Sequence, residues 1–240
     1  MFSTINQTVF AFINGYAGQS PLLDAVVLEL CNNHLFKGMV VATVLVGLWV
    51  SRGGQSDDRR TGVIATIVIS IAGILAGRLL AQTLPFSLRP IHTPDLVVNI
   101  PAAPTGTIDV LEGWSSMPSD HAVMYFALAT SVFLLSRWVG AFLFLHAAFV
   151  VSITRIFTGV HWPLDVVVGA SVGILVALAL HKPMTRMITR FDVVGLVSRY
   201  PVIAYPMLFF TLLQIGTMYE SPRRILSLLS SMVRMSTAAG

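Results

Sequence analysis

Long apolar runs separated by short polar segments dominate the chain. Six runs lack the alternation of barrel strands and are long enough to cross a bilayer as helices, at about 34–51, 61–84, 120–136, 138–154, 163–180 and 201–219. The run at 61–84 is uncharged from Gly62 to Gly77 and then carries Arg78. An arginine within a span is costly in lipid unless it faces a polar site. The pattern therefore predicts an all-α bundle of six membrane-spanning helices, with Arg78 turned toward a polar site.

The two ends of the chain have a different pattern. Residues 1–33 carry apolar residues at helical spacing, but polar residues such as Asn6 and Asn14 interrupt them. This predicts two short amphipathic helices lying in the membrane interface, the second opened by Ser20 and Pro21. We expect residues 34–219 to form one domain of six helices and residues 220–240 to form a basic amphipathic tail.

Composition agrees with a membrane protein. Hydrophobic residues make up 55% of the 240 residues and charged residues only 11%, whereas about a quarter of a soluble domain is charged. The net charge of +4 comes from scattered basic residues, which suits anionic lipid headgroups and gives no support for nucleic-acid binding. The single cysteine excludes an internal disulfide and cannot build a zinc site alone. The N-terminus lacks the basic region and apolar core of a cleavable signal peptide.

Basic residues also predict an orientation. The connectors 52–60, at 137 and 182–199 share one side of the predicted bundle and hold eight Lys and Arg residues, which indicates the cytoplasmic side. The composition of the connector 182–199 indicates an amphipathic segment that lies on an anionic membrane surface. The loops 85–119 and 155–162 then face the periplasm or exterior of a bacterial plasma membrane. The basic C-terminal tail favours the opposite orientation.

The segment TRIFTGVHWPLD, residues 154–165, carries candidate chemistry. Pro163 suits the first position of a helix, so His161 lies just outside this helix and Asp165 lies in its first turn. The carboxylate can then turn back to one ring nitrogen of His161, leaving the other as a nucleophile, while Arg155 clamps an anion such as phosphate. The alternative is that these are a membrane anchor, an interfacial histidine and a helix cap.

The long loop 85–119 brings further candidates to the same side. Arg89 lies near its start, and Ser119 is a predicted helix N-cap whose side chain and neighbouring amides can receive phosphate oxygens. His121 adds a second imidazole at this helix mouth. Two histidines, one nucleophile and one general acid, with two arginines form a phosphoryl-transfer site without metal. The alternatives are a plain cap at Ser119 and an interfacial histidine at His121.

These motifs resemble those of the type 2 phosphatidic acid phosphatase superfamily over roughly residues 20–181. Arg89-Pro90 is similar to the end of its first motif, Pro118-Ser119-Asp120-His121 to its second, and Thr154-Arg155 with His161 and Asp165 to its third. The resemblance implies a phosphohistidine on His161, oriented by Asp165, with His121 protonating the leaving group and later activating water. It implies that Arg89, Arg155 and Ser119 bind the phosphoryl group, with neither metal nor cofactor.

Two departures from the family's pattern concern phosphate binding. The family's motif lysine falls at Gln82, and Arg78, one helical turn earlier on nearly the same face, is its predicted substitute. Asp120 replaces the family's glycine, where it can pair with Arg78 or Arg89 or help to handle a proton. A similar Pro-Ser-Asp-His occurs in undecaprenyl pyrophosphate phosphatases.

The predicted function is a membrane phosphatase that removes a terminal phosphate from a lipid phosphate or diphosphate, with an undecaprenyl or other polyprenyl diphosphate as first choice. Phosphatidic acid, phosphatidylglycerol phosphate and a lipid A phosphate would use the same residues, as would a lipid phosphotransferase. A different class is a non-enzymatic transporter or binding protein for anionic lipids. Such a carrier predicts inverted repeats and polar residues near mid-membrane, and the sequence has neither. Oligomeric state stays open.

Overall fold

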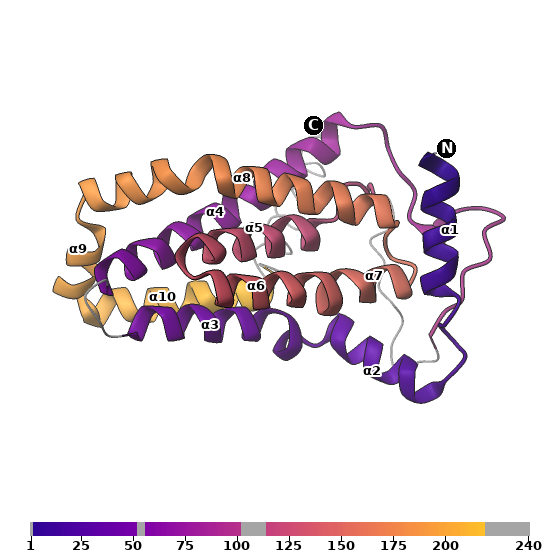
Figure 1. The fold of residues 1–240 in the computed structure, drawn as a ribbon, viewed down its shortest axis with the longest axis horizontal. Coiled ribbons are helices and arrows are strands. Elements are labelled where there is room, and N and C mark those ends of the chain that lie inside the picture. Colours follow the sequence, from indigo (N-terminus) through magenta and orange to yellow (C-terminus); the bar gives the residue numbers. More distant parts are fainter. Residues whose placement is uncertain (1, 52–55, 102–113, 219–240) are drawn as a thin grey trace, which may run out of the picture.

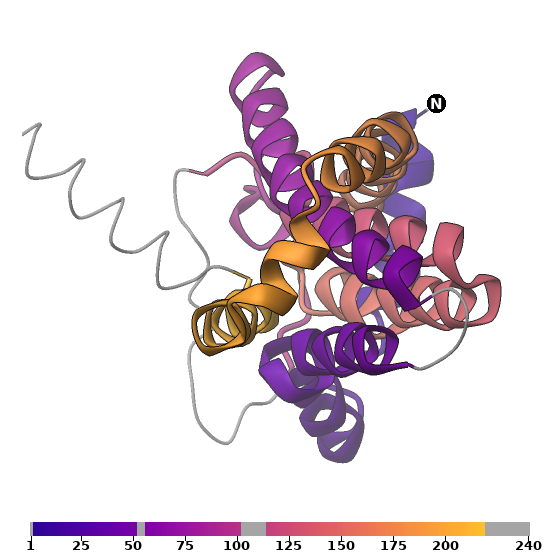
Figure 2. The ribbon, with the colours of Figure 1, turned by 90° about the vertical axis from the view of Figure 1, so that its left-hand side faces the viewer.

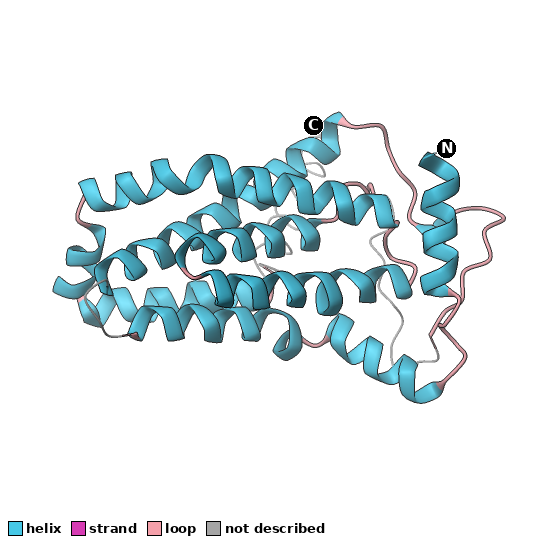
Figure 3. Cartoon of the chain, in the orientation of Figure 1, coloured by secondary structure: helices cyan, strands magenta, loops and turns pink. Residues whose placement is uncertain are grey.

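The computed structural model describes residues 2–51, 56–101 and 114–218, and within these ranges the regular structure is entirely helical (Figure 3). The elements are α1 (Phe2–Asn14), α2 (Pro21–Asn32), η1 (Leu35–Met39), α3 (Val40–Val50), α4 (Ser56–Thr83), η2 (Pro90–His92), α5 (Asp120–Leu135), α6 (Arg137–His146), η3 (Ala147–Ile153), α7 (Thr154–Phe157), α8 (Pro163–Arg190), α9 (Val193–Arg199) and α10 (Pro201–Gly216). The all-α prediction is thus confirmed for the described residues.

Three of the described helices are long and apolar enough to cross a membrane: Ser56–Thr83, Arg137–Phe157 and Pro163–Arg190. Two further helix pairs pass the same test only together, Pro21–Asn32 with Leu35–Val50, bent by 64°, and Val193–Arg199 with Pro201–Gly216, bent by 116°. Counting each bent pair as one span gives up to five spans, and α5 is apolar but shorter. The chain is an integral membrane protein; the number of six spans stays a prediction.

The long helices run side by side, with α5 between α4, α6 and α8 (Figures 1 and 2). Most side chains of α5 are buried, including Tyr125 and Leu128, which pack in one apolar core with Leu45 of α3 and Ile215 of α10. In Figure 1, α1 and α2 lie at one end of this bundle and α9 lies at the other. The first turns of α5 and α8 lie at the α1 end, which is where the candidate site residues gather.

Two glycines one turn apart set the distance between α5 and α8. A Cβ at Gly169 would lie 2.7 Å from the carbonyl oxygen of Ser119, and a Cβ at Gly173 would collide with the carbonyl oxygen of Val123. Small residues at this spacing let two membrane helices approach backbone to backbone. The approach is close enough for the Ser119 amide to donate to the carbonyl of Asp165 at 3.0 Å. Helix packing thus joins the two motifs.

The predicted end of the fifth span was wrong, because α8 continues past residue 180 to Arg190. Its last turns carry Ile188, which is buried against Ala65 and Ile69 of α4. That packing keeps the chain helical through Pro183, although proline removes a backbone hydrogen bond there. The connector predicted as one amphipathic segment is therefore split between α8 and α9. The break lies at Asp192, whose φ is 45° and whose carboxylate accepts from the Gly195 amide at 3.2 Å.

The two predicted N-terminal helices are present as α1 and α2. The Ser20 hydroxyl accepts from the Leu23 amide at 3.4 Å, and Pro21 is the first residue of α2, as predicted. Their placement in the membrane interface stays a prediction. The tail at 220–240 lies outside the described residues.

Candidate active site

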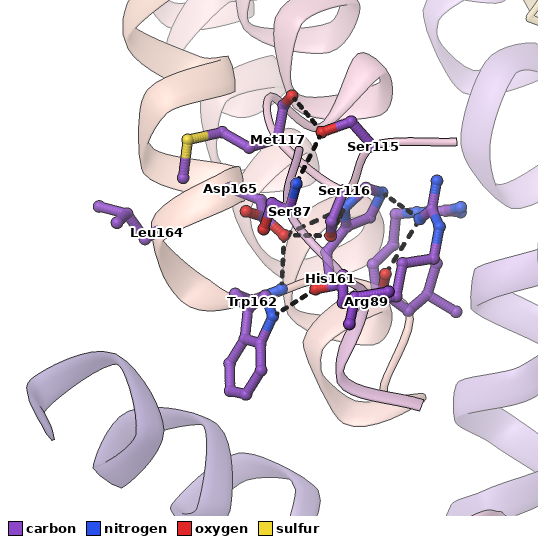
Figure 4. A network of polar contacts seen from close by, with 12 residues as sticks. Ser87, Arg89, Ser115, Ser116, Met117, His161, Trp162, Leu164 and Asp165 are labelled. Atoms are coloured by element: carbon purple, nitrogen blue, oxygen red, sulfur yellow. Dashed lines mark hydrogen bonds and ion pairs between the residues drawn. The ribbon is translucent and has the colours of Figure 1, made fainter. Parts of the chain in front are cut away.

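His161 and Asp165 adopt the local arrangement that their spacing predicted. The turn after α7 passes through Gly159 in the left-handed region, with a φ of 72°, and α8 then starts at Pro163. Asp165 is the third residue of α8, and its Oδ2 accepts from the Trp162 amide at 2.8 Å. The same oxygen lies 3.5 Å from Nδ1 of His161. Figure 4 shows the carboxylate turned back toward the imidazole.

The other ring nitrogen of His161 faces a cation. Nε2 lies 3.3 Å from Nη1 of Arg89, and because a guanidinium only donates, Nε2 must accept and the ring proton must be on Nδ1. Burial, at 4% exposure, is the largest cause lowering the pKa of His161 to about 4. The neighbouring Asp165 carboxylate opposes this shift, and the charges of Arg155 and Arg89 add to it. At neutral pH the imidazole is therefore uncharged, with its Nε2 lone pair directed into the site.

Two arginines from different segments complete the charged part of the site. Arg89 is buried and donates to the carbonyl of Val160 at 3.0 Å. Burial first, and then the charge of Arg155, lowers the pKa of Arg89 to about 10, while Asp165 raises it, so Arg89 is still a cation at pH 7. Arg155 places Nη1 3.3 Å from Nε2 of His121. Each arginine thus contacts one of the two histidines.

Ser119 is the N-cap residue of α5, as predicted, and its side chain makes no capping hydrogen bond, so the hydroxyl does not act as a plain helix cap. Its side chain is fully buried, and its backbone lies against Gly169 of α8. Among the described residues, the Ser119 hydroxyl and the Nε groups of Arg89 and Arg155 are buried without a hydrogen-bond partner. Three unused donors from three segments suit the oxygens of a phosphoryl group.

Arg78 and Asp120 form an ion pair, which confirms one of the pairings considered for Asp120. The guanidinium also lies over the ring of Trp114, 4.4 Å from its centre, a favourable cation–π distance. Gln82, at the position of the family's lysine, is exposed on the last turn of α4. The pair anchors the end of α4 to the residue directly before His121.

Ser116 is a site residue that sequence reasoning missed. Its hydroxyl contacts Oδ2 of Asp165 and lies 3.3 Å from Nδ1 of His161 (Figure 4). Ser116 is fully buried, and its amide donates to the carbonyl of Ser87 at 2.8 Å. Its place just before Pro-Ser-Asp-His is the one available signal, and nothing in the sequence distinguishes it from Ser115.

The polar residues of α1 have a role that the interfacial prediction did not contain. Nδ2 of Asn14 donates to the carbonyls of Asn99 and Phe157, both at 2.8 Å, and Oδ1 of Asn6 accepts from the Leu164 amide at 2.9 Å. Predicted as interruptions of an amphipathic helix, Asn6 and Asn14 instead tie α1 to the end of α7 and the start of α8. Phe10 of α1 also packs on the Trp162 ring, with centres 5.1 Å apart. Helix α1 therefore covers the segment that carries His161.

Comparison with known proteins gives a family. Residues 85–187 match the family described as PAP2 superfamily. The chain is also 34% identical over 178 residues to the Bacitracin transport permease protein BcrC of Bacillus licheniformis, a match that covers 74% of this chain and 79% of that protein. The chain belongs to the PAP2 superfamily. The PAP2 match begins before Arg89 and ends within α8, so it contains every predicted site residue except Arg78.

Two further similarities were found for this PAP2 superfamily member. Undecaprenyl-diphosphatase BcrC of Bacillus subtilis (strain 168) is 24% identical over 182 residues, covering 74% of this chain and 83% of that protein. The crystal structure of Aquifex aeolicus LpxE matches with a TM-score of 0.49 and 30% sequence identity, over 74% of this chain and 95% of that chain.

Proposed function

We propose that this PAP2 superfamily member is a membrane phosphatase that removes the terminal phosphate of a lipid phosphate or diphosphate through a phosphohistidine on His161. The observation that supports this most is the neutral, buried imidazole of His161, oriented by Asp165 and facing Arg89 through Nε2. A neutral imidazole nitrogen beside fixed cations is a nucleophile placed where an anionic phosphoryl group binds.

In the first step Arg89 turns its N–H from Nε2 of His161 to a phosphate oxygen, the freed Nε2 lone pair attacks phosphorus, and the bond from phosphorus to the leaving oxygen breaks. The leaving oxygen takes the bonding electrons and a proton from His121, which enters this step doubly protonated once Arg155 has likewise turned from its Nε2 to the phosphate. Arg89, Arg155 and Ser119 donate to the non-bridging oxygens, where negative charge is concentrated. In the second step His121 removes a proton from water, the hydroxide attacks phosphorus, and the nitrogen–phosphorus bond breaks with its electrons returning to Nε2.

For the substrate we propose a polyprenyl diphosphate such as undecaprenyl diphosphate. The support is the similarity to one relative, Undecaprenyl-diphosphatase BcrC, together with the Pro-Ser-Asp-His motif of this chain, which resembles the second motif of undecaprenyl pyrophosphate phosphatases. A diphosphate also has more non-bridging oxygens than a monophosphate, which matches a site with several arginines. The two arginines and two histidines supply the charge stabilisation and proton transfer that this mechanism needs without a metal.

We further propose that the site faces the non-cytoplasmic side of a plasma membrane, with α1 and α2 in the interface. Apolar side chains of α1, at Ile5, Val9 and Phe12, are exposed and spaced along one helical stripe. The first turns of α5 and α8 lie at this end of the bundle (Figure 1), away from α9 and its basic neighbours. A lipid headgroup at the membrane surface would meet the site there.

The test is phosphate release by purified protein in detergent with EDTA, from polyprenyl diphosphate and phosphatidic acid side by side. His161→Ala is expected to lower turnover by about 10³-fold or more, because the covalent route is lost, while lipid binding is largely kept. His181→Ala, far along α8 from the first turn that carries Asp165, is the matched control and should keep activity. Release that survives in His161→Ala would refute the phosphohistidine, and loss of wild-type release with EDTA would refute the metal-free route. Lipid transfer without phosphate release would indicate a carrier.

A further inference from the structure

The hydroxyl of Ser116 lies between the two groups that the proposed mechanism treats as a direct pair. Nδ1 of His161 is 3.5 Å from Oδ2 of Asp165, longer than an ordinary N–H···O hydrogen bond. Oγ of Ser116 is nearer to Nδ1, at 3.3 Å, and is also hydrogen-bonded to Oδ2 of Asp165. All three side chains are buried, so water screens none of these contacts.

The donors and acceptors of this cluster fit one arrangement. Arg89 donates to Nε2 of His161, so the ring proton is on Nδ1 and must be donated. An ionised carboxylate only accepts, so the Ser116 hydroxyl donates to Oδ2 of Asp165 and its lone pair is left to accept from Nδ1. The order is thus His161 to Ser116 to Asp165, and each proton in it has an acceptor.

Neighbouring backbone holds the hydroxyl in this position. The Ser116 amide donates to the carbonyl of Ser87 at 2.8 Å, and the Ser119 amide, three residues on, donates to the carbonyl of Asp165 at 3.0 Å. Oδ2 of Asp165 is in turn held by the Trp162 amide at 2.8 Å. A serine fixed on both sides can orient a histidine without itself moving.

We propose that Ser116 is a positioning residue for His161, an inference that rests on the proposed phosphatase function. When Nε2 forms its bond to phosphorus, the imidazole gains positive charge while Nδ1 keeps its proton. The hydrogen bond from Nδ1–H of His161 to the Ser116 oxygen then becomes stronger, because the Ser116 hydroxyl donates its own proton to the Asp165 carboxylate and its oxygen is therefore a better acceptor. No proton is transferred from His161 through Ser116 to Asp165. These two hydrogen bonds hold the imidazole ring and stabilise the positive charge that develops on it.

The kinetic test compares Ser116→Ala with Ser115→Ala and Ser116→Thr. Ser115 is the matched control, because its hydroxyl donates to the carbonyl of Met117 at 3.3 Å and serves backbone groups. Ser116→Ala is expected to lower kcat about 10- to 100-fold with KM within about twofold, as for other groups that orient a functional histidine. Ser116→Thr, which keeps the hydroxyl, should recover most of this loss. Equal activity of Ser116→Ala and Ser115→Ala would overturn the proposal.

A double-mutant cycle separates positioning from general loss of structure. If Ser116 acts through Asp165, then Ser116→Ala should have no further effect in an Asp165→Asn background, because the acceptor charge is already gone. If the two substitutions lower kcat independently and additively, the proposal that Ser116 acts through Asp165 is refuted.

A second readout does not depend on turnover. In ¹⁵N-histidine NMR spectra, Ser116→Ala should shift the Nδ1 resonance of His161, whereas Ser115→Ala should not. If the Nδ1 resonance shifts in a protein that releases no phosphate, the phosphatase function is refuted while the positioning role of Ser116 is retained. If the Nδ1 resonance is unchanged in an active phosphatase, only the positioning role of Ser116 is refuted.

Discussion

At the scale of the residue, the ionisation of His161 decides whether it is a nucleophile. Its pKa in the folded protein is about 4, against an ordinary value of about 6.5 in an unfolded chain. We expect ¹⁵N NMR, with His161→Asn used to assign the resonances, to find a neutral ring with its proton on Nδ1 from pH 8 down to about pH 5. A protonated His161 at pH 6 would contradict this, as would the opposite tautomer.

The lowered pKa of His161 also predicts how the stability of the protein changes with pH. As pH falls from about 6.5 toward 4, the unfolded chain binds a proton at residue 161 before the folded protein does, so this site's contribution, fully present above pH 6.5, is progressively lost. The unfolding midpoint in detergent should therefore fall less between pH 7 and pH 5 for His161→Asn than for the wild type. Parallel falls would show that residue 161 does not contribute.

At the scale of the element, the packing of α5 against α8 brings Ser119 and Asp165 together. We expect Gly173→Ala to lower the unfolding free energy by about 1–3 kcal/mol, because its methyl group meets the Val123 carbonyl and forces the two helices apart. Activity should fall as well, since the site spans both helices. Gly47→Ala in α3 is the control, because a Cβ there meets nothing within 4 Å. Unfolding midpoints and phosphate release for both variants check this, and equal behaviour would refute the packing argument.

At the scale of the whole molecule, the proposed orientation is testable by cysteine labelling, since the one native cysteine, Cys31, is buried. Val97 is exposed at the α1 end, and Ser198 of α9 is exposed at the other end. In intact spheroplasts an impermeant maleimide should label Val97→Cys, whereas Ser198→Cys should react only after lysis. The reverse pattern would place the site on the cytoplasmic side and favour the orientation suggested by the basic tail.

The sequence by itself determined what lies within one helix or one turn. Apolar runs located the long helices, and the step from His161 through Pro163 to Asp165 sufficed to turn a carboxylate back to an imidazole, because such contacts depend on local helical geometry. It also determined the family, through motifs that keep their order and spacing. The tertiary structure alone decided the contacts between distant segments. Arg89 faces His161, Ser116 stands between His161 and Asp165, and Asn14 ties α1 to α7 because packed helices bring those segments together. Spacing along the chain does not fix these individual contacts, which depend on backbone contact at positions like Gly173.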